Sequence, residues 1–306
     1  MFGTFVHGLD GTLARPGGRA SVVDVAGGVG DREFGAESGG VGYRALDGVP
    51  GWCRGGLPGV DRARVDAAGP DENRIVRVLR AQIADYAAAV GRAAEEGSPD
   101  VAARIAEDFF IPVSLWGHNS EPGLWMRDLL DADFTGHAAM AANRWIASHW
   151  FMFFGNDLDR SVALAGEAVE LDPESGWAHV MATFAAVLSG RADDARETAA
   201  DARERARDAG ERAGVFIAMG TALLRTGDIG GATRMADDFV AWAEERRFPS
   251  AMAMALFVRG QTLTEQQPAE ALRTFERALT HIRAEIPGCW NVETLIRRDM
   301  IPLVHR

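Results

Sequence analysis

A unit of two helices recurs through the second half of this 306-residue chain, and it limits the fold more than any other feature. Each unit has an apolar helix, a short turn with Gly, Asn or Asp, and an amphipathic helix that opens on a small residue. The opening residues are Ser161, Ala195, Ala232 and Ala271, at intervals of 34, 37 and 39 residues. We therefore expect an all-α fold in which helix pairs stack into a superhelix.

A period near 34 residues with two helices per unit is the tetratricopeptide pattern. Gly190 and Gly227 are expected at the turns, and Pro268 stands where a helix can start. Gly220 matches a further consensus position. Two predicted buried stripes support the pattern: Ala192, Ala195, Ala199, Ala202, Ala206 and Ala209 in the second unit, and Leu272, Phe275, Leu279 and Ile282 in the fourth. The alanine stripe would let a neighbouring helix approach closely.

The organisation predicted from these patterns has three parts. Residues 1–70 hold 18 of the 35 glycines and follow neither helical nor strand periodicity, so we expect a disordered or poorly ordered leader. Residues 71–132 form a helical segment, which opens with a stripe at helical spacing: Ile75, Val78, Leu79, Ile83, Tyr86 and Val90. Residues 133–306 carry the repeats and end in a helix that caps the array.

The helical segment resembles the start of the repeat arm in large bacterial ATPase regulators of the LuxR, AfsR and MalT type, including cyclase-linked forms. The matching residues are Glu72, Asn73, Ala102 to Arg104, Trp116, Gly117, Glu121 and Trp125. The resemblance covers roughly residues 71–285 and implies the repeat arm of a signalling or transcriptional regulator whose head domains are missing. The chain contains no lysine, so the phosphate loop of such an ATPase is impossible here.

Composition excludes several classes of function. The formal net charge of −12 argues against direct nucleic-acid binding. The seven histidines do not cluster, and the two cysteines, Cys53 and Cys289, are far apart, so we predict no metal and no cofactor. No segment has the pattern of a signal peptide or of a membrane span, which predicts a cytoplasmic protein without membrane contact. The oligomeric state stays open.

One short motif in the leader suggests catalysis. The run Asp10-Gly11-Thr12 resembles the nucleophile motif of haloacid dehalogenase-like phosphatases. The position of the attacking aspartate is Gly8, however, so we expect no phosphatase and no enzyme.

The function expected from these observations is that of a non-catalytic module that binds a protein or peptide in the concave groove of the stack. By repeat register, the groove residues are expected to be Asn143, Trp150, Trp177, Phe184, Thr221 and Gln261. Aromatic side chains are frequent anchors in such contacts, although core packing is the competing interpretation of these aromatics. The alternative function is the sensing of a small inducer molecule in the same groove.

Overall fold

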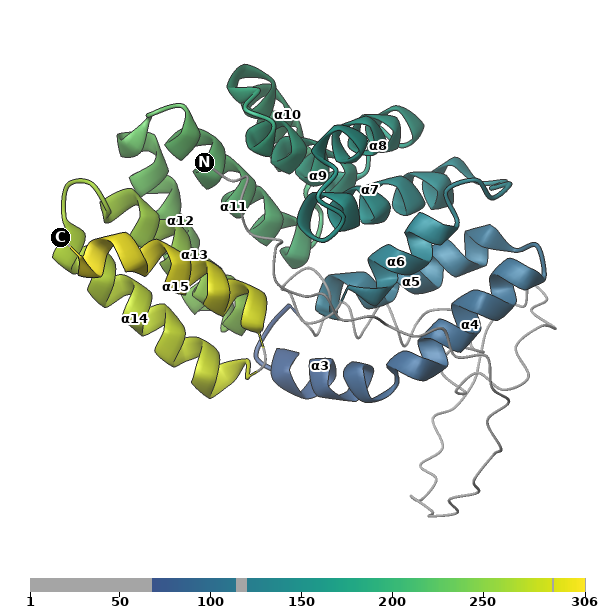
Figure 1. The fold of residues 1–306 in the computed structure, drawn as a ribbon, viewed down its shortest axis with the longest axis horizontal. Helices are drawn as coiled ribbons and strands as arrows, with labels where there is room; N and C mark the ends of the chain where they lie inside the picture. Colours follow the sequence, from purple (N-terminus) through teal and green to yellow (C-terminus); the bar gives the residue numbers. More distant parts are fainter. Residues whose placement is uncertain (1–67, 114–119, 288, 306) are drawn as a thin grey trace, which may run out of the picture. The chain divides into compact units, whose positions relative to one another are not determined.

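The computed structural model describes residues 68–113, 120–287 and 289–305, and these residues belong to one compact unit. Over these ranges the chain forms helices and no strand, so the predicted all-α fold is confirmed (Figure 1). The helices are α3 (Glu72–Ala81), α4 (Ile83–Glu95), α5 (Pro99–Val113), α6 (Glu121–Asp128), α7 (His137–Phe153), α8 (Leu158–Leu171), α9 (Gly176–Leu188), α10 (Ala192–Arg205), α11 (Ala209–Arg225), α12 (Ile229–Arg246), α13 (Pro249–Leu263), α14 (Pro268–Glu285) and α15 (Trp290–Val304).

The predicted repeats correspond to helix pairs. Helix α7 packs on α8, α9 on α10, α11 on α12 and α13 on α14, and the first helices α7, α9, α11 and α13 also contact one another in order (Figure 1). The four small residues that open the second helices have no exposed surface: Ser161, Ala195, Ala232 and Ala271. A larger side chain at these points would separate the paired helices, which explains why the sequence pattern locates the pairs correctly.

Local polar contacts fix the ends of these helices. Asp157 and Asp228 accept hydrogen bonds from backbone N–H groups in the first turns of α8 and α12, at 3.1 and 2.8 Å. Asp208 and Glu211 form a capping box at the start of α11. The predicted turns at Gly190 and Gly227 are confirmed, since both glycines adopt the left-handed conformation, with φ of 78° and 80°.

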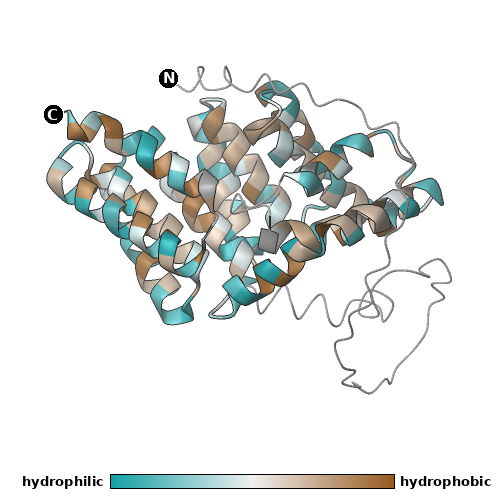
Figure 2. Cartoon of the chain, turned by 60° about the horizontal axis from the view of Figure 1, so that its bottom comes forward, coloured by the Kyte–Doolittle hydropathy of each residue, from teal (hydrophilic) through white to brown (hydrophobic). Residues whose placement is uncertain are grey.

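The buried apolar residues form two large clusters. The first joins α4, α5 and α6 to the first two helix pairs through residues such as Phe110 and Trp145, and the second fills the last two pairs around Phe239 and Phe275. Phe184 packs against both clusters. In Figure 2, polar and apolar residues alternate along the helices, as expected when each helix buries one side. The helical segment before the repeats therefore shares its core with them.

Two of the stripes predicted from the sequence are wrong in detail. The stripe that begins at Ile75 does not continue on one helix, because the chain breaks at Gln82 between α3 and α4 and leaves Val78 50% exposed. The alanine stripe ends at Ala202, because α10 ends at Arg205. Ala209 instead begins α11, where the Asp208 cap starts a new helix.

Helix α15 occupies the position predicted for a capping helix and packs on α13 and α14. Its last turn leaves Ile301 and Val304 59% and 64% exposed, so apolar surface remains at the C-terminal end of this helix. At the other end of the described chain, the carboxyl oxygen Oε2 of Glu72 in α3 accepts a hydrogen bond of 2.8 Å from the backbone N–H of Ser250 in α13. This bond joins positions 178 residues apart in the sequence.

Two predictions concern the leader. Both predictions fall on residues that lie outside the described ranges, apart from a turn at residues 68–70. They are the expected disorder of residues 1–70 and the phosphatase-like motif at Asp10. As for membranes, every helix in the described ranges is too short or too polar to cross a bilayer.

Candidate functional site

Four of the six predicted groove residues occupy equivalent places on the first helices of the pairs. We call Trp150, Phe184, Thr221 and Gln261 the register column, since each lies 10 or 11 residues before the small residue that opens the second helix. All four are half-buried. They are therefore the predicted groove residues that keep surface for a ligand, and their place in a groove stays a prediction.

The side chains of the register column differ in how firmly the protein holds them. Trp150 packs against Gly123 of α6, and the guanidinium of Arg127 lies 4.7 Å from the centre of its ring. The Thr221 hydroxyl donates to the carbonyl of Ile217 at 2.7 Å. Gln261 donates through Nε2 to Asp299 of α15 at 2.8 Å. These contacts already use the hydroxyl donor of Thr221 and one amide N–H of Gln261.

Phe184 differs from the other three members, because its side chain is apolar and lies where the two buried clusters meet. The ring of Phe184 therefore lies at the boundary between the two core clusters of the stack. A partner that covers Phe184 would contact both halves and would bury apolar surface that the fold leaves partly open.

The other two predicted groove residues are not available to a ligand. Asn143 has no exposed surface and donates through Nδ2 to the carbonyl of Met126 at 2.8 Å. Trp177 is 1% exposed and stacks on Trp145 with ring centres 5.7 Å apart. Both lie seven residues before a member of the register column, but α6, α7 and α11 cover this part of the first helices. Their assignment to the groove is corrected: they are core residues.

An exposed aromatic residue that the groove prediction did not include lies near the end of α7. Phe153 is 49% exposed, and its ring centre lies 4.8 Å from that of His149. Burial lowers the pKa of His149 from 6.5 to about 3, so this imidazole stays neutral at physiological pH. The excess of aromatic residues in this helix was visible in the sequence, but their individual exposure depends on the packing of α5 and α8.

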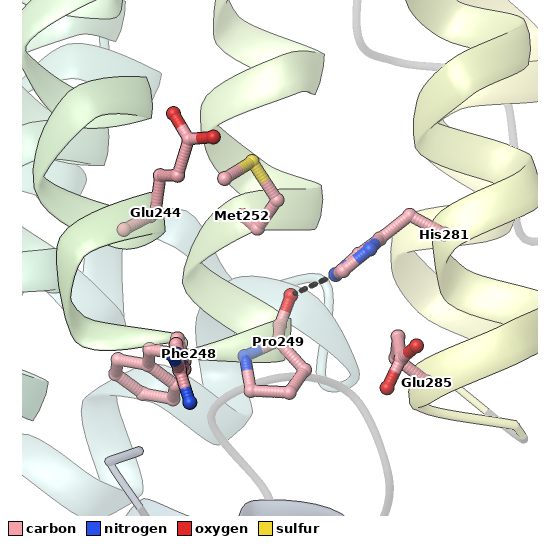
Figure 3. Close-up of a pocket in the computed structure, with 8 residues that line it drawn as sticks. Glu244, Phe248, Pro249, Met252, His281 and Glu285 are labelled. Carbon is pink, nitrogen blue, oxygen red and sulfur yellow. Dashed lines mark hydrogen bonds between the residues drawn. The ribbon is translucent and has the colours of Figure 1, made fainter. Parts of the chain in front are cut away.

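A pocket of about 230 Å³ lies where the end of α12, the start of α13 and the second half of α14 meet (Figure 3). We call it the α12–α14 pocket. Its lining residues are Ala243, Glu244, Arg247, Phe248, Pro249, Met252, His281 and Glu285. Sequence reasoning missed this pocket because its residues come from two different repeats, and their periodicity describes only the buried side of each helix.

Polar groups border an apolar floor in the α12–α14 pocket. Ala243, Phe248 and Pro249 are buried, whereas Glu244, Arg247 and Glu285 are exposed. His281 donates through Nε2 to the carbonyl of Pro249 at 3.0 Å, which fixes the orientation of its ring (Figure 3). Across the described ranges, no three His, Cys, Asp or Glu side chains gather closely enough to hold a metal ion.

Comparisons with known proteins assign this chain to no family. No protein-family model matches the chain, and no curated protein matches it.

Proposed function

We propose that this chain is a non-catalytic module that binds a protein or peptide along the first helices of its helix pairs. The observation that carries the proposal is the half-buried Phe184 in the register column, an apolar ring in contact with both core clusters. Stacked helix pairs present their first helices as one continuous surface, and an extended segment can contact several repeats at once.

The resemblance to the repeat arm of LuxR-, AfsR- and MalT-like regulators supports a role in bacterial signalling or transcription control. Within this proposal, the partner is another protein, because a net charge of −12 disfavours the phosphate backbone of nucleic acids. The cytoplasm is the compartment that fits this role and the buried free thiol of Cys289. Inducer sensing in the groove remains the alternative, and no contact of the register column favours it.

The test is a selection of peptides from a displayed random library against the purified chain. We expect the selected peptides to lose at least tenfold in affinity on Phe184→Ala, since truncating a central aromatic anchor typically costs more than about 1.4 kcal/mol. Fluorescence anisotropy with a labelled peptide measures the dissociation constant, and far-UV circular dichroism verifies that the variant is folded.

The matched control is Phe153→Ala, which removes an equally large, half-exposed ring from α7 outside the register column. The control should leave peptide affinity within about twofold of the parent. Equal losses for the two variants, or selected peptides that tolerate Phe184→Ala, would show that the register column is not the binding surface.

A further inference from the structure

We propose that the α12–α14 pocket binds a small organic cation, an amine or guanidine group joined to a short apolar stem. This inference is independent of the proposed partner surface, because no residue of the register column lines the pocket. Three features support it: the size of the pocket, its apolar floor and the hydrogen-bond acceptors on its rim.

The size sets the class of ligand. A volume of about 230 Å³ is below the roughly 300–1,000 Å³ of sites for drug-sized molecules, so the pocket fits a fragment-sized molecule or a single side chain. The floor of Ala243, Phe248 and Pro249 is buried, and the thioether of Met252 adds a flexible, polarisable wall. Such a floor favours an aliphatic or aromatic stem over a fully polar ligand.

The side chains on the rim of the pocket determine which charge on a ligand is favoured. Glu244 extends from α12 on one side of the pocket, and Glu285 and His281 extend from α14 on the other (Figure 3). Neither glutamate forms an ion pair with a described residue. The Nε2–H of His281 donates to the carbonyl of Pro249, so Nδ1 is the ring nitrogen that this hydrogen bond leaves on the rim.

Two carboxylates thus offer hydrogen-bond acceptors around an apolar floor, beside the imidazole ring of His281. Arg247 also lines the pocket and reduces the formal charge of the two carboxylates from −2 to −1. A ligand with several N–H donors and a positive charge complements this rim, whereas a carboxylate ligand would meet two like charges.

The experiment uses three ligands of nearly identical size and shape: benzamidine as the cation, benzamide as the neutral form and benzoate as the anion. The readout is the chemical shift of the Met252 methyl group in protein with ¹³C-labelled methionine methyls, assigned through Met252→Leu. We expect benzamidine to bind at least tenfold more tightly than benzamide, and benzoate to bind more weakly still.

Two double variants test whether the glutamates on the rim are the groups that bind the cation. Glu244→Gln with Glu285→Gln should weaken benzamidine at least tenfold. The control, Glu245→Gln with Glu276→Gln, makes the same charge change on the same two helices outside the pocket, and it should weaken binding by less than twofold. Arg247→Gln removes a cation from the rim and should tighten benzamidine.

Three results would overturn the proposal. They are equal affinities for benzamidine and benzamide, equal losses for the two double variants, and a Met252 methyl signal that benzamidine does not move.

A comparison of free agmatine with an arginine blocked at both ends then distinguishes the two sources of such a cation. Tighter agmatine would indicate a free metabolite, and blocked arginine of equal or higher affinity would indicate a side chain of a partner.

Discussion

The Glu72→Gln variant should be more stable than the parent protein, by roughly 1 kcal/mol at pH 5.5 and by about 5 kcal/mol at pH 8.5. Glu72 is 1% exposed, and burial raises the pKa of its carboxyl from 4.5 to about 8 against the opposing effect of the hydrogen bond from Ser250. The unfolded chain releases this proton near pH 4.5. Between these values the folded state binds the extra proton, so the stability of the parent falls as pH rises and the loss is complete above about pH 8.

Glutamine has the shape of glutamate and no charge to bury. Its carbonyl oxygen can still accept from the Ser250 N–H, while its amide replaces Oε1, which has no hydrogen-bond partner among the described residues. Burial raises the pKa of the neighbouring Cys289 thiol to about 12, so this group stays neutral over the range tested. The stability difference should therefore follow the titration of one carboxyl group.

Urea unfolding followed by far-UV circular dichroism at pH 5.5, 7 and 8.5 measures this difference. Glu95→Gln, at an exposed position of α4, controls for the change in net charge and should shift the unfolding free energy by less than about 0.5 kcal/mol. A gain from Glu72→Gln that does not grow with pH, or a loss of stability, would show that Glu72 is ionised in the folded protein.

The Gly260→Ala variant should be less stable than the parent by about 2–3 kcal/mol. A Cβ atom at position 260 would lie 2.5 Å from Cδ1 of Phe275, the aromatic ring that α14 directs onto α13. Phe275 has no exposed surface, so the ring has no free space into which to move. This overlap outweighs the roughly 1 kcal/mol that alanine gains over glycine in a helix.

The same substitution at Gly166 of α8 has the opposite expected result. No atom lies within 4 Å of the Cβ position there, so Gly166→Ala should stabilise the protein by about 0.5–1 kcal/mol. Urea unfolding measures both variants. In a Phe275→Val background, which lacks the ring, Gly260→Ala should lose most of its cost. An undiminished cost in that background would assign the effect to another contact.

Most of the fold could be predicted from residues near one another in the sequence. Ser161, Ala195, Ala232 and Ala271 identified the second helix of each pair, and Gly190 and Gly227 identified turns, because helical periodicity and left-handed glycine geometry are local properties. The break at Gln82 had no comparable local signal, since the apolar stripe continues across it.

The candidate sites were less predictable. The register identified Trp150, Phe184, Thr221 and Gln261 as half-buried positions, but it could not show that Asn143 and Trp177 are covered, because the covering atoms belong to other helices. Phe184 was identified by register alone. Its contact with both core clusters became visible only when the helix pairs were stacked.

The sequence by itself determined that this chain folds into paired helices and where most of them begin, since capping groups, turn residues and small buried residues act within a few positions of themselves. Only the tertiary structure decided what those helices enclose. It placed Glu72 against Ser250, packed Gly260 against the ring of Phe275 and formed the α12–α14 pocket from two repeats. Burial and electrostatic environment depend on atoms distant in the sequence, which no local pattern specifies.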